Sequence, residues 1–228
     1  MQTKDMPSCA LCPFEWSKRY CRGPGGKGPE NCPSLLRDLA KEAQALVGAP
    51  ALLKFARNCS IQESKAYGGR DLGYEHIHPT KARIQEIVEF AKRMEYKRLA
   101  LIFCVGLRRE AVIVHKMFED HDFETVSVAC KVGRMPKSGL GLSREDHVDP
   151  AVEAETMCNP VLQALVANRC RAELNVLLGL CVGHDSLFIR HAEAPVTVLA
   201  VKDRLLGHNP LAAIYTYDSY YRSLKAAK

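Results

Sequence analysis

Apolar residues change their spacing part-way along the chain, from a helical repeat near the start to alternating helices and strands later. Ser34 follows Pro33 and is suited to begin a helix, because its side chain can cap the first turn. A second helix is predicted over residues 50–65, followed by a glycine-rich loop. The apolar stripe of the first helix consists of Leu35, Leu36, Leu39, Ala43, Leu46 and Val47.

Continuous apolar runs after Thr80 predict buried strands separated by amphipathic helices. Strands that are apolar on both faces and alternate with helices are typical of a parallel sheet. The predicted fold class is therefore α/β, with a three-layer, Rossmann-like parallel sheet. The predicted strands are 99–104, 125–130, 174–181 and 196–201. Asn159-Pro160 opens a further helix, whose buried face is predicted as Leu162, Leu165, Val166 and Arg169 or Cys170.

Three segments follow from these patterns: a cysteine-rich segment (1–33), a helical lead-in (34–78) and an α/β domain (79–228). The first segment is rich in proline and glycine and has too few apolar residues for a conventional core. Something other than apolar burial must hold it together.

Ten cysteines among 228 residues change the picture from a plain α/β domain to one with metal or thiol chemistry. The start shows no apolar signal-peptide core and no run is long enough to span a membrane, so we expect a cytoplasmic protein with reduced thiols and no membrane partner. The formal charge of +6 comes from scattered basic residues, so we do not expect a nucleic-acid partner.

The first candidate site is the pattern C-x2-C-x8-C-x10-C near the start of the chain, formed by Cys9, Cys12, Cys21 and Cys32. Closely spaced thiolates can share one metal ion, and two more complete a tetrahedral site. Zinc is the default for four thiolates. Iron–sulfur clusters also take four, and two of these cysteines precede proline as in ferredoxin-type ligands.

The second candidate site, which is a metal or thiol site, consists of cysteines that end predicted strands or precede a helix. In a parallel sheet these positions share the carboxyl edge, where ligands bind. The group holds a cluster, or one or two of its members act as acid, base or nucleophile. Its members are Cys104, Cys130, Cys158 and Cys181.

Other polar residues follow the third and fourth strands and are predicted to line a pocket over these cysteines, where the cations suit a small anionic ligand. No dinucleotide-binding glycine loop and no P-loop occurs in the sequence. The predicted pocket residues are His184, Asp185, Lys202, Arg204, His208 and Asn209.

Seven short runs of the sequence carry a resemblance to a known family: IVEFAKRM (87–94), FCVGL (103–107), MCNP (157–160), ELN (173–175), GLCVGHD (179–185), VKDR (201–204) and HNP (208–210). They resemble the domain-of-unknown-function 1847 family of uncharacterised, predicted metal-binding proteins. The resemblance covers nearly the whole chain and implies metal binding while leaving the activity unknown.

Three functions remain open at this point. The first is a metal-binding protein whose second cysteine group holds a cluster or does redox chemistry. The second is a cofactor-free, racemase-like enzyme in which Cys158 and Cys181 act as acid and base on a small anionic substrate. The third is a regulatory binding module that contains zinc.

Overall fold

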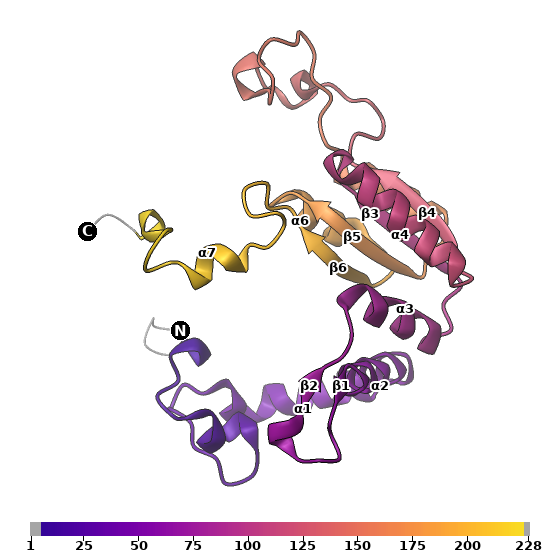
Figure 1. Cartoon of the computed structure of the whole chain (residues 1–228). Coiled ribbons are helices and arrows are strands. Elements are labelled where there is room, and N and C mark those ends of the chain that lie inside the picture. Colours follow the sequence, from indigo (N-terminus) through magenta and orange to yellow (C-terminus); the bar gives the residue numbers. More distant parts are fainter. Residues whose placement is uncertain (1–5, 226–228) are drawn as a thin grey trace. The chain divides into compact units, whose positions relative to one another are not determined.

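The computed structural model describes residues 6–225 and divides the chain into two compact units, Met1–Ser64 and Lys65–Lys228. The first unit holds the cysteine-rich segment, helix α1 (Arg37–Gly48) and nearly all of helix α2 (Pro50–Lys65). The second unit holds the sheet (Figure 1).

A four-stranded parallel sheet forms the centre of the second unit, in the order β4-β3-β5-β6. Its strands are β3 (Arg98–Phe103), β4 (Glu124–Ala129), β5 (Leu174–Leu180) and β6 (Val196–Val201). All seven residues of β5 are buried, as expected of a strand covered on both faces. The α/β class and the four predicted strands are thereby confirmed.

The strand order reverses at β3, since the chain first moves to one side to form β4 and then to the other side to form β5 and β6. In open parallel sheets, the carboxyl ends of the strands at such a reversal form a crevice where ligands bind. The crevice expected here lies between the ends of β3 and β5.

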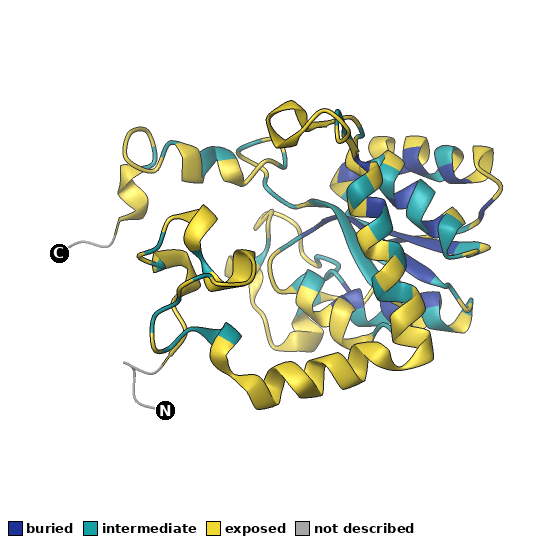
Figure 2. Ribbon diagram, turned by 90° about the horizontal axis from the view of Figure 1, so that it is seen from below, coloured by how far each residue is buried: buried dark blue, intermediate teal, exposed yellow. Residues whose placement is uncertain are grey.

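Alternate residues of the strands enter two separate hydrophobic clusters. Buried residues are dark blue in Figure 2. Leu99 and Leu101 of β3 join residues of α3 (Arg83–Arg93) and α4 (Arg108–Asp120). Ala100 and Ile102 of β3 join residues of α5 (Pro160–Arg169) and α6 (His184–His191). Period-two alternation therefore divides the strand's side chains between the two clusters.

The predicted buried face of α5 is wrong. Leu165 is 53% exposed, whereas Gln163, Ala164 and Ala167 are fully buried. Small side chains let the helix approach the sheet closely, and the Gln163 amide donates hydrogen bonds to backbone carbonyls there. The start of the helix is as predicted: Asn159 accepts a hydrogen bond from the Leu162 amide, and Pro160 is the first helical residue.

The remaining elements are short. Strands β1 (Tyr67–Gly68) and β2 (His78–Pro79) pair antiparallel, and α7 (Leu211–Tyr215) lies near the end of the chain. Between β4 and α5, residues 131–157 contain only short 3₁₀ turns and project beyond the carboxyl ends of the strands (Figure 1). Within residues 6–225, no helix is both long enough and apolar enough to cross a membrane.

Candidate functional site

The cysteine-rich segment folds back on itself between its third and fourth cysteines. The Tyr20 amide donates to the Lys27 carbonyl at 2.7 Å, and the Lys27 amide donates to the Lys18 carbonyl at 2.8 Å. Glycine is required at Gly26, because a Cβ there would lie 2.3 Å from the Arg19 carbonyl oxygen. This fold brings distant parts of the segment around one cavity.

All four N-terminal cysteines line this cavity, whose volume is about 50 Å³. Cys9 and Cys21 are exposed, Cys12 and Cys32 are half-buried, and none is in a disulfide. No residue from Met6 to Ile61 is buried, so the described part of the segment, residues 6–33, has no apolar core of its own. The donor set and the room around it fit one thiolate-bound metal ion, although the thiols are not gathered at coordination distance.

The four cysteines of the second group also come together, at the carboxyl edge of the sheet. Cys104 and Cys130 directly follow the paired strands β3 and β4, whose last residues are in register. Cys181 directly follows β5. Cys158 reaches the same edge because the next amide, that of Asn159, donates to the Cys130 carbonyl at 2.8 Å. Cys104 and Cys181 therefore lie at the reversal point of the strand order. Cys130 lies beside Cys104, at the end of the paired strand β4.

Three of these thiols form a hydrogen-bonded series. Cys104 donates to Cys130, and Cys130 donates to Cys158. The Val105 amide also donates to the Cys130 sulfur, at 3.4 Å. The series has a direction, with a thiol donor at Cys104 and a thiolate acceptor at Cys158.

The pKa values of Cys104 and Cys158, the two ends of this series, are shifted in opposite directions from the ordinary cysteine value. The hydrogen bond to Cys130, together with burial, raises the pKa of Cys104 from 9.0 to about 12. The hydrogen bond from Cys130 lowers the pKa of Cys158 to about 7, assisted by the positive charge of Lys131 and opposed by burial. At neutral pH the site therefore holds a protonated thiol and a thiol that is about half ionised.

Two basic side chains, those of Arg204 and Lys202, lie close to thiols of this group. Arg204 donates to the Cys181 sulfur at 3.0 Å. The Lys202 ammonium lies 3.5 Å from the position that a Cβ on Gly106 would take, and its charge acts on Cys104. Within residues 6–225, neither cation forms an ion pair with a carboxylate. The site is therefore electropositive and suited to thiolates or an anionic ligand.

The other predicted pocket residues are engaged differently. His184 begins α6, and its amide, like that of Asp185, donates to the Cys181 carbonyl. The Asp185 carboxylate accepts from the Ser186 amide. His208 accepts from the Asp203 amide through its ring, and the Asn209 amide donates to the Leu206 carbonyl within the same turn. Lys202 and Arg204 are thus the predicted pocket residues that the structure places against thiols.

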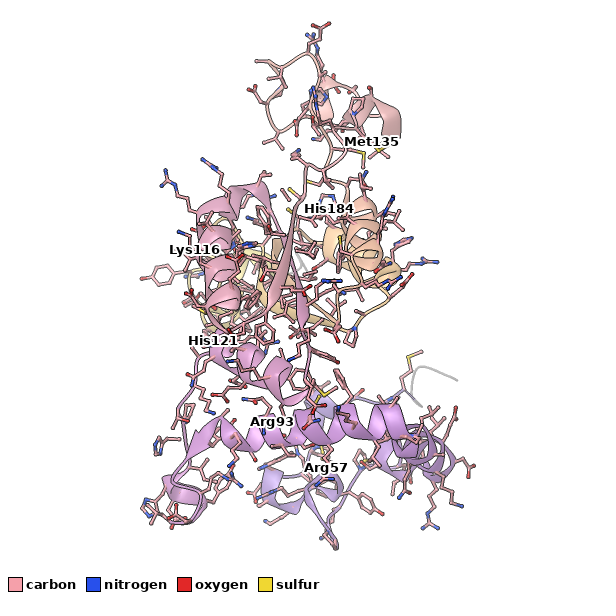
Figure 3. All side chains as sticks on the ribbon, turned by 90° about the vertical axis from the view of Figure 1, so that its right-hand side faces the viewer. Arg57, Arg93, Lys116, His121, Met135 and His184 are labelled. Carbon is pink, nitrogen blue, oxygen red and sulfur yellow. The ribbon has the colours of Figure 1, made fainter. Side chains whose placement is uncertain are left out.

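Figure 3 labels His184 at the start of α6 and Met135 at the base of the projecting segment. His184 lies at the carboxyl edge of the sheet, and Met135 lies beyond this edge, in the projecting segment.

Sequence reasoning missed three residues that shape this site. The Gln163 amide donates to the carbonyls of Phe103 and Val128, which fixes the ends of β3 and β4 just before Cys104 and Cys130. Gly179 has a φ of +69° at an irregularity in the pairing of β5 with β6. Lys131 bonds to the Thr156 carbonyl and pairs with Glu155. Of these three residues, only Lys131 had a signal in the sequence, because it directly follows Cys130 at the end of a predicted strand.

Neither cysteine group is preassembled around a metal position. Among the described residues, no three His, Cys, Asp or Glu side chains are placed so that they could hold one ion.

The sequence profile of a family described as "Protein of unknown function (DUF1847)" matches residues 32–199. The chain belongs to this family. The uncharacterized protein MJ0455 of Methanocaldococcus jannaschii is 45% identical to it over 141 residues, which cover 62% of this chain and 69% of that protein. The DUF1847 match includes all four cysteines at the sheet edge and begins at the last cysteine of the N-terminal set.

Proposed function

We propose that this DUF1847 protein binds one metal centre, a zinc ion or an iron–sulfur cluster, through Cys9, Cys12, Cys21 and Cys32. The observation that carries the proposal is that all four cysteines line one small cavity in a segment with no buried residue among those described, 6–33. Metal coordination supplies folding free energy to segments that cannot bury enough apolar surface. Zinc and an iron–sulfur cluster both accept four thiolates, and the metal analysis below distinguishes them.

Replacing both Cys9 and Cys12 with serine is expected to remove the bound metal, because two of its four ligands are lost. Metal content is measured by mass spectrometry on protein purified without oxygen, and visible absorbance distinguishes a cluster from zinc. Cys59→Ser is the matched control, since Cys59 is an exposed cysteine in α2 outside the cavity. Equal metal content in the double variant and the unaltered protein would rule the proposal out.

For the second cysteine group we propose thiol chemistry, in which Cys158 is the reactive thiolate. The series from Cys104 through Cys130 to Cys158 supports this, because it concentrates negative charge on one sulfur. The nearby charge of Lys131 also favours the thiolate. The carboxyl edge of a three-layer, Rossmann-like sheet is a common place for such chemistry, and the two core clusters support that arrangement.

Alkylation of Cys158 by iodoacetamide is expected to accelerate with pH and reach half of its maximal rate near pH 7, because only the thiolate reacts. In Lys131→Ala the midpoint is expected to move upward, since a stabilising positive charge is lost. Lys116→Ala, on the exposed side of α4, is the charge-matched control. The rates are measured residue by residue through mass spectrometry of tryptic peptides.

Two outcomes of that measurement would contradict thiol chemistry at Cys158. One is an alkylation midpoint at or above pH 9, the ordinary range for cysteine. The other is a brown protein in which Cys104, Cys130, Cys158 and Cys181 are all protected, which would indicate a cluster at the sheet edge.

A further inference from the structure

Cys130 and Cys158 lie at the two ends of the projecting segment, residues 131–157, and hydrogen bonds join these ends at the base of the segment. Across this base, the Asn159 amide donates to the Cys130 carbonyl, and the Met157 amide donates to the Met135 carbonyl, each at 2.8 Å. A further bond of 2.8 Å joins the Lys137 amide to the Glu155 carbonyl. The two backbones therefore run side by side, which holds Cys130 next to Cys158.

Side chains reinforce the same base. Glu155 lies 3.3 Å from Lys137 and 3.6 Å from Lys131, and its side chain is only 14% exposed. Lys131 also donates to the Thr156 carbonyl. These bonds hold the two ends of the segment together next to the cysteine pair, so Cys130 and Cys158 are kept close without a covalent link.

A disulfide requires Cα atoms within about 7 Å and side chains that face each other. The backbone hydrogen bond from Asn159 to Cys130 and the interaction between the thiols of Cys130 and Cys158 place the two residues as such a pair requires. Lys202 and Arg204 supply positive charge without a carboxylate partner in residues 6–225. Such charge favours a substrate that carries carboxylates.

We propose that Cys158 and Cys130 form a redox dithiol that reduces small, carboxylate-bearing disulfides, with Cys158 attacking and Cys130 resolving. This inference rests on the thiol chemistry proposed above and adds its partner residue, its reaction and its substrate class.

The reaction has two steps. The Cys158 thiolate attacks one sulfur of the substrate, so that a Cys158–substrate disulfide forms, the substrate S–S bond breaks and the first thiolate leaves. Cys130 then loses its proton and attacks the Cys158 sulfur, which releases the second thiolate. The protein pair, a thiolate and a thiol, loses two electrons and one proton, and the substrate leaves as two thiolates, one of which can take up that proton. A small dithiol such as dithiothreitol returns the pair to its reduced form.

Tryptic peptides make this reaction visible in the full-length protein, because the relevant cysteines fall on different peptides. Cys130 lies in 117–131, Cys158 in 145–169, Cys104 in 99–108 and Cys181 in 172–190. The reduced protein is treated with one equivalent of 5,5′-dithiobis(2-nitrobenzoate), an anionic disulfide. Free thiols are then blocked, and the peptides are analysed by mass spectrometry.

The expected product is peptide 117–131 linked to peptide 145–169. Cys158→Ser is expected to abolish this link, and Cys130→Ser is expected to leave a mixed disulfide on Cys158. Cys170→Ser is the control, because Cys170 ends α5, where its carbonyl accepts from Arg98 at the start of β3, away from the carboxyl edge.

The substrate class is tested with a neutral disulfide, 4,4′-dithiodipyridine, beside the anionic one. Combining Lys202→Ala with Arg204→Ala is expected to slow formation of the link by about tenfold with the anionic disulfide and to change it by less than about twofold with the neutral one. Circular dichroism of each variant verifies folding, and Lys202→Gln with Arg204→Gln repeats the test if the alanine pair misfolds.

The inference fails if Cys130 links to Cys104 instead, if the mixed disulfide persists in the unaltered protein, or if the charge variants slow both disulfides equally. Fast alkylation of Cys158 near pH 7 without a Cys130–Cys158 disulfide would overturn the dithiol and leave thiol chemistry standing. Slow alkylation would overturn both.

Discussion

Replacing Phe188 with alanine is expected to lower the free energy of unfolding by about 3–5 kcal/mol. Phe188 is fully buried and belongs to the cluster that joins α6 to the sheet. Helix α6 has only eight residues and no other buried side chain, so the ring provides most of its attachment. Because α6 begins shortly after Cys181, reactivity at the sheet edge is expected to change as well.

Urea unfolding followed by circular dichroism measures this loss. Phe188→Leu retains much of the volume and is expected to cost less than Phe188→Ala. Val182→Ala serves as the control near the same helix, because Val182 is 93% exposed. A loss below about 1 kcal/mol for Phe188→Ala would mean that α6 is held by other contacts.

Replacing Gly179 with alanine is expected to lower the free energy of unfolding by about 2–5 kcal/mol, since two costs combine. The residue has a φ of +69°, which an L side chain adopts at a cost of about 1–2 kcal/mol. In addition, the new Cβ would lie 2.2 Å from Cδ1 of Leu107, so the side chain must move out of a packed core.

Gly139→Ala is the matched control, because nothing lies within 4 Å of its Cβ position. It is expected to change stability by less than about 0.5 kcal/mol. Adding Leu107→Val to Gly179→Ala is expected to restore part of the steric loss, although not the backbone cost. Equal stability of the two glycine variants would show that the strand irregularity tolerates a side chain.

The strands and helices of the second unit were predictable because burial alone determines their patterns. A strand as apolar as β5, in which Asn175 is the one polar residue, can form only where both faces are covered, and the alternation in β3 divides its side chains between two clusters. The face of α5 was not predictable in this way. A polar residue, Gln163, occupies one of its fully buried positions, because its amide donates to two strand carbonyls that sequence periodicity does not reveal.

The sheet-edge cysteines could be grouped from the sequence because each of Cys104, Cys130 and Cys181 ends a recognisable strand, and parallel strands end at one edge. The order of the thiols within the group could not be predicted. It depends on the hydrogen bonds from Cys104 to Cys130 and from Cys130 to Cys158, and the second of these requires that the projecting segment bring Cys158 back to Cys130.

Because the base of segment 131–157 is closed by hydrogen bonds, the position of the cysteines does not depend on the length or the sequence of the segment. Because Cys130 and Asn159 are already bonded, the ends of the segment stay together whatever connects them. Doubling the length of such a connection costs only about 0.6 kcal/mol in closure entropy. Evolution can therefore lengthen, shorten or replace this excursion, and alter what it recognises, without displacing the sulfur atoms beneath it.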